Sequence, residues 1–224
     1  MTSTYPATIL SPPDFEDAVC FPTTRHARAS TYLSAYFRAT MAVADSIDIE
    51  AVERAADLLL AAYSTGACVF SCGNGGSAAI ANHLQCDHLK GVQTGTDLTP
   101  RVISLSSSVE LLTAIANDIS YHEVFAYQLQ SQSRPGDVLI AISSSGQSAN
   151  VVRALGWARD HGLSTIALTG FEGGEARSLA DVSIHVASAN YGIIEDLHQA
   201  VMHTMAQFVR QSRMSPDTIA TTTF

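Results

Sequence analysis

The sequence predicts a doubly wound α/β fold with a mostly parallel sheet of about five strands. The strands are expected from short apolar runs, typical of buried parallel strands, at 68–71, 101–105, 138–143, 164–169 and 182–186. Helical patterns separate these runs, near residues 77–89, 109–117, 121–132, 148–161 and 175–179. Strands that alternate with helices build a parallel sheet covered by helices on both faces.

Two helices are expected before the first strand. Residues 30–44 carry apolar side chains at helical spacing, and a second helix runs from Asp48, a suitable N-cap, to Tyr63, with Gly66 as its stop. We interpret the pair as a helical hairpin that is available for packing against another chain. A long helix, at 192–213, is the last element expected.

One domain is the expected organisation. The 224 residues, 46% of them apolar, suffice to bury a full core in a single domain, which we place at residues 26–213. Residues 1–25 contain prolines and lack periodicity, so we expect an arm on the surface or on a neighbouring subunit; disorder is the alternative. Residues 214–224 form a polar tail, which we expect to be frayed.

Charge and hydropathy exclude several classes of partner. The chain has 21 acidic and 12 basic residues, a formal charge of −9, which opposes binding to nucleic acid or to an anionic membrane. No apolar run approaches the ~20 residues of a membrane helix, and no secretion signal is recognisable, so a cytoplasmic protein is expected. The four cysteines form no CxxC pair and are interpreted as reduced, buried thiols.

Two turns between a strand and a helix are candidates for binding an anion. The first, a glycine-rich turn at 73–77, would bring unpaired N–H groups and a helix N-terminus together; close packing explains such a turn equally well. The second is Ser143-Ser144-Ser145-Gly146-Gln147-Ser148, for which simple helix capping is the alternative. Ligands of doubly wound sheets bind at the edge where both turns lie.

Two helices carry candidate metal ligands. His83 and Asp87, four residues apart, share one helix face, although a solvated surface pair would have the same spacing. On the last helix Glu195 and His203 can flank one pocket, but the spacing equally allows Asp196 with His203 or Glu195 with His198. Two imidazoles and two carboxylates could hold zinc or another divalent cation. Such a site could isomerise an aldose and a ketose through an enediol.

Four segments, taken in order, identify a family. They are CGNGGSAA at 72–79, LLTAIAND at 111–118, PGDVLIAISSSG at 135–146 and LTGFEGG at 168–174. Together they resemble the sugar isomerase (SIS) domain of bacterial phosphoheptose isomerases, over residues 30–213. The resemblance implies a homotetramer with active sites between subunits, which converts sedoheptulose 7-phosphate to D-glycero-D-manno-heptose 7-phosphate or to an epimeric heptose 7-phosphate.

The resemblance also implies roles for individual residues. His83, Asp87, Glu195 and His203 match the positions of the family's zinc ligands, with Asp87 as base and His203 as acid. Substrate contacts are implied for a larger set: Asn74, Gly75, Gly76, Asn117, Asp118, Ser143, Ser144, Ser145, Ser148 and Glu195.

Two ligand positions depart from the family, which usually has Glu at the position of Asp87 and Gln at that of Glu195. The shorter side chain and the added carboxylate affect the proton-transfer geometry and the metal preference. Other hypotheses are a non-catalytic phosphosugar-binding module, with a regulatory or replication-initiator-binding role, and an isomerase of hexose or pentose phosphates. Retention of all four potential ligands favours the enzyme.

Overall fold

The computed structural model describes residues 14–224 and contains the predicted five-stranded parallel sheet. Its strands, in the order β2-β1-β3-β4-β5, are β1 (Cys68–Gly73), β2 (Arg101–Ser104), β3 (Val138–Ser143), β4 (Ser164–Thr169) and β5 (Val182–His185). Each neighbouring pair is parallel, with Cys72 of β1 opposite Ala141 of β3. The predicted fold class is therefore confirmed.

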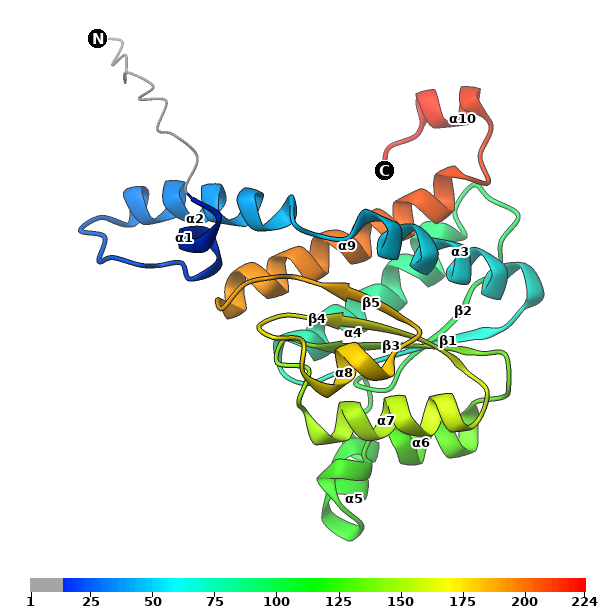
Figure 1. Cartoon of the computed structure of the whole chain (residues 1–224). Helices are drawn as coiled ribbons and strands as arrows, with labels where there is room; N and C mark the ends of the chain where they lie inside the picture. The colour runs from blue at the N-terminus through cyan, green and yellow to red at the C-terminus, as the bar shows by residue number, and fades with distance from the viewer. Residues whose placement is uncertain (1–13) are drawn as a thin grey trace.

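Helices cover both faces of the sheet (Figure 1). One face carries α3 (Ile49–Thr65), α4 (Gly76–Cys86) and α9 (Tyr191–Gln211), and the other carries α5 (Val109–Asp118), α6 (Ala126–Gln132), α7 (Ala149–Asp160) and α8 (Gly174–Leu179). Alternate residues of β3 separate the two cores: Ile140 and Ile142 pack with the first group, Leu139 and Ala141 with the second. This alternation is that of a strand buried on both sides.

The helix after the glycine-rich turn is longer than expected. It continues from α4 into η1 (Asp87–Val92), a segment of wider π-helical turns, whereas the sequence predicted an end near residue 89. A π turn displaces the residues around it relative to a regular α-helix. Here His88 is buried against Tyr63, while Asp87 lies partly exposed beside α9.

The two N-terminal helices are present, but they do not fold back on each other as a hairpin. The helices α2 (Ala29–Ala44) and α3 follow one another, and each packs on α9 instead (Figure 1). The predicted caps of α3 are formed: Asp48 accepts a hydrogen bond from the Glu50 N–H, and Gly66 is left-handed with φ +75°. A hydrogen bond of 2.6 Å from the Tyr36 hydroxyl to Asp196 ties α2 to α9.

The described residues near both chain ends form helices that the sequence did not predict. Residues 1–13 of the predicted arm lie outside the described residues; the rest contains α1 (Phe15–Val19), which packs on α2 and buries Ala18. The polar tail forms α10 (Pro216–Thr221), capped by Ser215. The boundaries of the predicted domain itself stay a prediction.

Two further sequence expectations concern the thiols and the membrane. Cys68 and Cys72 are buried, and burial raises the pKa of the Cys72 thiol to about 12, but Cys20 and Cys86 are exposed, so that part of the cysteine prediction is wrong. Cys20 is the C-cap residue of α1, and Cys86 lies where α4 passes into η1. Among residues 14–224, no helix combines the length and the apolar character that crossing a membrane requires.

Candidate active site

A pocket of about 290 Å³ lies at the carboxyl ends of β1 and β3. The chain leaves β1 toward β2 on one side, and β3 lies on the other side, so this is the point where the strand order reverses. Ligands of doubly wound sheets bind at such a reversal. The pocket is lined by the glycine-rich turn, the serine segment and the start of α9: Asn74, Gly75, Gly76, Ser77, Ile142, Ser143, Ser144, Ser145, Ser148, Tyr191 and Glu195.

The glycine-rich turn brings the chain unusually close to neighbouring atoms. A Cβ at Gly73 would lie 2.7 Å from the Ser77 carbonyl oxygen, and one at Gly76 would lie 2.3 Å from Glu195 Oε2. Gly75 has φ +55°, which a larger residue would adopt only with strain. The Glu195 carboxylate therefore faces the positive end of α4 and disfavours a second anion there.

The serine segment is better suited to a phosphate. Ser148 is the N-cap residue of α7, yet its side chain makes no capping hydrogen bond, so capping does not explain this serine. The buried Ser144 hydroxyl has no hydrogen-bond partner within the described residues. Ser148 Oγ accepts a 3.3 Å hydrogen bond from the Ser143 hydroxyl and keeps its own proton. The Ser144 and Ser148 hydroxyls are thus available as donors to an anion bound near a helix N-terminus.

A second glycine turn, at residues 170–174, packs against the serine segment. A Cβ at Gly146, whose φ is +64°, would lie 1.8 Å from the Gly173 carbonyl oxygen. The Gly170 N–H donates to the Ser144 carbonyl, at 2.8 Å, and the Ala176 N–H to that of Gly146, at 3.0 Å. Backbone bonds thus hold the loop in shape before a ligand arrives, which lowers the ordering cost of binding.

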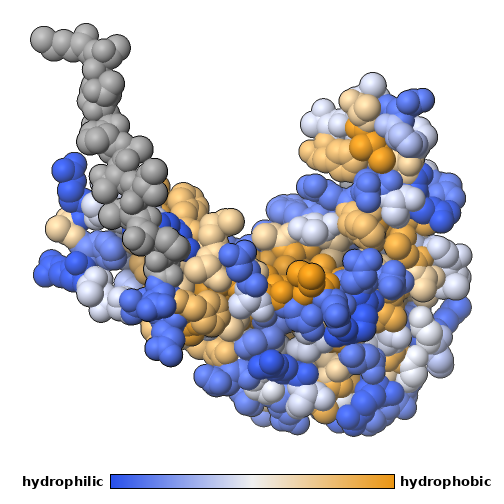
Figure 2. Space-filling model, turned by 45° about the horizontal axis from the view of Figure 1, so that its top comes forward, coloured by the Kyte–Doolittle hydropathy of each residue, from blue (hydrophilic) through white to orange (hydrophobic). Residues whose placement is uncertain are grey.

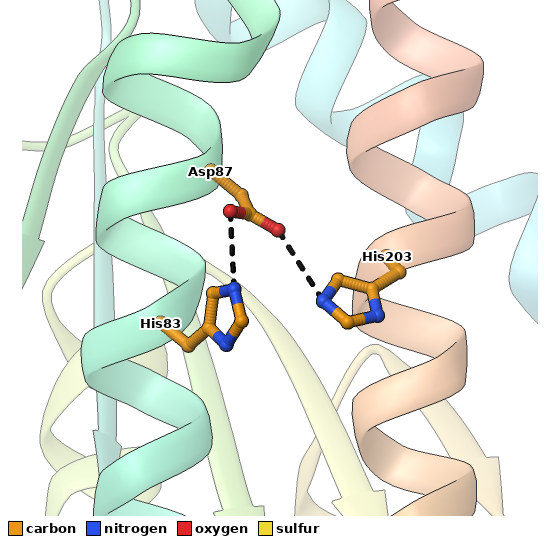
Figure 3. A group of neighbouring side chains, drawn as sticks. All are labelled: His83, Asp87 and His203. Atoms are coloured by element: carbon orange, nitrogen blue, oxygen red, sulfur yellow. Dashed lines mark ion pairs between the residues drawn. The ribbon is translucent and has the colours of Figure 1, made fainter. Parts of the chain in front are cut away.

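The sequence candidates His83, Asp87 and His203 meet between α4 and α9 (Figure 3). Asp87 lies at the centre: its Oδ1 is 3.2 Å from His83 Nε2, and its Oδ2 is 3.5 Å from His203 Nε2. The side chains are 28% to 48% exposed, so solutes reach them. A carboxylate between two imidazoles can move protons or, with them, bind a cation.

Comparisons with known proteins agree with this arrangement. Residues 32–170 match the family model described as SIS domain. A phosphoheptose isomerase from Mycobacterium tuberculosis is 40% identical over 175 residues, 77% of this chain and 87% of the relative. The chain belongs to the phosphoheptose isomerase family. The family predicted from the four sequence segments, and with it an isomerase enzyme, is confirmed.

Solved structures of other members of the phosphoheptose isomerase family share the fold. One from Neisseria gonorrhoeae has a TM-score of 0.73 and 32% identity, covering 81% of this chain and 99% of its own. Another, from Francisella tularensis, has a TM-score of 0.75 and 28% identity, covering 81% of this chain and 96% of its own. The resemblance therefore extends over nearly the whole length of both neighbours.

The donor set of this isomerase fits a divalent metal. Two imidazoles and a carboxylate are ligands that zinc and related cations accept. Their ligand atoms lie within 4.8 Å of one another, close enough for all three to contact one ion after small rotations. Glu195, the fourth predicted ligand, is not part of this cluster, because its carboxylate lies at Gly76.

Helical spacing alone left several residues of α9 as candidates for the site. Tertiary packing gives each of them a different environment. His198 is buried and donates from Nε2 to the Thr169 carbonyl, at 3.1 Å; burial lowers its pKa to about 4, so it is a neutral core residue. Asp196 accepts the hydrogen bond from Tyr36. His203 remains as the residue that faces His83 and Asp87.

Asn117 and Asp118 are placed apart from this pocket. They end α5, which projects from the opposite face of the sheet (Figure 1), and the Asn117 amide donates to Asp118 at 2.7 Å. Neither is among the described residues that line the pocket. Their contact with substrate stays a prediction.

Sequence reasoning missed several residues around the site. Tyr191 lines the pocket and packs edge-on against Phe171, with ring centroids 4.7 Å apart. Asn150 and Tyr121 both donate to Asn74 Oδ1, at 2.9 and 2.8 Å, and so orient this side chain. Gln199 contacts His203, and only this residue could have been found by spacing, since it lies one turn from His203 and one from Glu195.

Proposed function

We propose that this isomerase interconverts sedoheptulose 7-phosphate and D-glycero-D-manno-heptose 7-phosphate, or an epimeric aldoheptose 7-phosphate. The observation that carries the proposal is a phosphate-compatible serine loop next to an imidazole–carboxylate cluster. The substrate class is taken from the relatives, which are phosphoheptose isomerases. We further propose that the reaction serves heptose biosynthesis in carbohydrate metabolism, in the cytoplasm.

The spacing of the two parts supports a long sugar phosphate. Gly76, at the pocket, and His83 are seven residues apart on one helix, which corresponds to about 10 Å along its axis. An extended seven-carbon chain with a terminal phosphoester has about the same length, given C–C bonds of ~1.5 Å. A substrate whose phosphate contacts Ser143, Ser144, Ser145 and Ser148 would thus present its first two carbons near Asp87.

The proposed residue roles follow from this pose. Asp87 removes a proton from C1 of the ketose while the C2 carbonyl oxygen gains one, giving an enediol. His203 exchanges the hydroxyl protons, and Asp87 returns its proton to C2, so that C1 becomes the aldehyde. Asn74, Gly75, Gly76 and Glu195 would contact the sugar. A divalent cation held by His83, Asp87 and His203, zinc in our proposal, would polarise the oxygens on both carbons.

The homotetramer predicted from the sequence is also proposed here. The projecting helix α2 exposes Leu33, Phe37 and Met41, with Phe37 59% and Met41 66% exposed. Figure 2 shows hydrophobic residues on this projecting part and in the hollow beside it. A subunit packed there would cover them, and an assembly with sites between subunits would let Asn117 and Asp118 reach a neighbour's pocket. Light scattering of wild type and of Phe37→Glu would measure the oligomeric state.

The decisive experiment is incubation of metal-analysed protein with sedoheptulose 7-phosphate, followed by NMR, with and without a chelator. We expect an aldoheptose 7-phosphate to form, and the chelator to stop its formation. Turnover that a chelator does not affect would refute the metal part of the proposal. Bound metal without turnover would indicate another sugar phosphate, and sugar phosphate binding with neither metal nor turnover would indicate a non-catalytic binding module.

A further inference from the structure

The side-chain amides of Asn74 and Asn150 form a reciprocal pair beside the sugar pocket. Asn74 Nδ2 donates to Asn150 Oδ1 at 2.8 Å, and Asn150 Nδ2 donates to Asn74 Oδ1 at 2.9 Å. Asn74 belongs to the glycine-rich turn after β1, and Asn150 is the second residue of α7, which follows the serine segment. The pair therefore connects the two turns that line the pocket, although the two residues are 76 positions apart in sequence.

A backbone group fixes which atom of each amide is the oxygen. The Val151 N–H lies 3.0 Å from Asn150 Oδ1, and a backbone N–H can only donate. The other atom of the Asn150 amide is therefore the nitrogen, and only the oxygen of Asn74 can accept its hydrogen bond. Asn150 is 2% exposed, so solvent does not compete for these hydrogen bonds.

Tyr121 completes the set of partners of the Asn74 amide. Its hydroxyl, on η2 (Tyr121–Glu123), donates to Asn74 Oδ1 at 2.8 Å. Tyr121 and Asn150 thus occupy both lone pairs of this oxygen, and Asn150 also takes one of the N–H groups of Asn74. Within residues 14–224 this leaves one N–H of Asn74 for a ligand in the pocket that it lines. Asn74 therefore offers a ligand a donor and not an acceptor.

We propose that Asn150 and Tyr121 are positioning residues that hold Asn74 as a hydrogen-bond donor, so that this part of the pocket selects an oxygen acceptor of the ligand. The inference deepens the proposed function and rests on its sugar phosphate pocket. Because the partners exclude the other orientation of the amide, Asn74 loses little freedom when the ligand binds. A ligand group that can only donate, such as an ammonium group, has no partner at Asn74.

The test is a double-mutant cycle between Asn74 and Asn150 in the full-length protein, with ligand affinity as the readout. The probe is the heptitol 7-phosphate made by borohydride reduction of sedoheptulose 7-phosphate, which has no carbonyl and so binds without turnover. Calorimetry measures its dissociation constant. A residue that acts only by orienting Asn74 has no effect once the Asn74 amide is absent.

The cycle has a defined expected result. Asn150→Leu keeps the approximate size of the side chain, and we expect it to weaken binding about fivefold to tenfold, the range of one hydrogen bond. Asn74→Ala should weaken binding by about as much. The double variant should bind within about twofold of Asn74→Ala, because the two losses have one cause.

Gln128→Leu is the matched control, because it also replaces a buried amide by leucine. Gln128 is 4% exposed, donates to the carbonyls of Leu105 and Val124, and is not among the described residues that line the pocket. We expect a lower melting temperature and an unchanged affinity for the heptitol phosphate. An equal loss of affinity in Gln128→Leu and Asn150→Leu would assign the loss to reduced stability and overturn the inference.

Tyr121→Phe keeps the inference testable if Asn150→Leu does not fold. Tyr121 is 55% exposed, and the substitution removes only its hydroxyl. We expect binding about twofold to fivefold weaker, and no further loss in the Asn74→Ala background. Tyr127→Phe, the same change at a 46% exposed tyrosine of α6, is its control. Equal affinities of Tyr121→Phe and Tyr127→Phe would decide against the positioning role.

Inorganic phosphate, as a second probe, identifies the source of the acceptor. The proposed function places the sugar at Asn74, so we expect Asn150→Leu to leave the binding of inorganic phosphate unchanged. Weaker binding of both probes would support the inference with the acceptor on the phosphate group instead.

The outcomes also separate the inference from the proposed function. Additive losses in the double variant, or wild-type affinity in Asn150→Leu, would overturn the inference and leave the isomerase intact. The expected cycle in a protein that converts no sedoheptulose 7-phosphate would support the inference and overturn the proposed reaction. Wild-type protein that binds neither probe would overturn both.

Discussion

The serine loop and the His83–Asp87–His203 cluster are built by different means. The loop occupies one continuous segment at a strand end, and backbone hydrogen bonds from Gly170 and Ala176 hold its shape. The cluster joins side chains from α4 and α9 that are 116 residues or more apart in sequence, and within residues 14–224 no backbone group is hydrogen-bonded to these side chains. A site for an anion can thus be made from local chain geometry, whereas a site for proton transfer or metal depends on how two helices pack.

His203→Ala tests the part of the site that depends on helix packing, and we expect the largest effect there. Loss of an acid–base group costs about 10²–10⁴-fold in kcat, and here a potential ligand is lost as well. The fold should be retained, because His203 is partly exposed and its neighbours Met202 and Met205 form the core. Turnover of sedoheptulose 7-phosphate and circular dichroism provide the measurement; wild-type kcat would contradict the assigned role.

Gly146→Ala tests whether the loop is held in place by the second glycine turn. The added Cβ would lie 1.8 Å from the Gly173 carbonyl oxygen, at a φ of +64°, so the loop must move. We expect a KM at least tenfold higher and a loss of about 1–3 kcal/mol in unfolding free energy. Gly156→Ala, where a Cβ meets no atom within 4 Å, is the control and should be neutral or stabilising by up to about 1 kcal/mol.

Ser145→Ala also tests the serine loop, with a smaller change than Gly146→Ala. The substitution removes one hydroxyl from the pocket, together with the 3.2 Å hydrogen bond that this hydroxyl accepts from the Gln147 N–H. A hydrogen bond to a charged group contributes about 1.5 kcal/mol or more, so we expect KM to rise about tenfold. Because a phosphate is held equally in the ground and transition states, kcat should change little. Steady-state kinetics separates the two; a fall in kcat at constant KM would be the contrary result.

The pH dependence of stability tests the buried face of α9, which carries His198, and not the side that carries His203. Burial lowers the pKa of His198 to about 4 from 6.5, so the unfolded state binds the proton more readily. Below pH 6.5 and down to about pH 4, this histidine should therefore reduce stability, by up to about 1.4 kcal/mol per pH unit. Urea unfolding at pH 7.5 and pH 5 measures the loss, which should be smaller in His198→Gln. Equal losses in both proteins would argue against this assignment.

Much of the fold could be predicted from the sequence because the evidence for it is local. Apolar runs such as 138–143 and 164–169 became β3 and β4 with the same limits, and Asp48 and Gly66 delimit α3 as expected. The arrangement of α2 and α3 could not be predicted, because periodicity shows which helix face is apolar and not what covers it. Here α9 covers both, and the Tyr36–Asp196 bond and the π turn at Asp87 belong to that packing.

The sequence by itself determined the α/β class, the two turns at the sheet edge and the family, since each depends on the order of residues along the chain. Only the tertiary structure decided which side chains of α9 face α4. Helical spacing allowed His198, Asp196 or Glu195 as partners; packing buried the first, bonded the second to α2 and placed the third at Gly76. His203 and Gln199 meet His83 because two helices distant in sequence lie side by side, and the direction in which a helix faces its neighbour is set by the core they share.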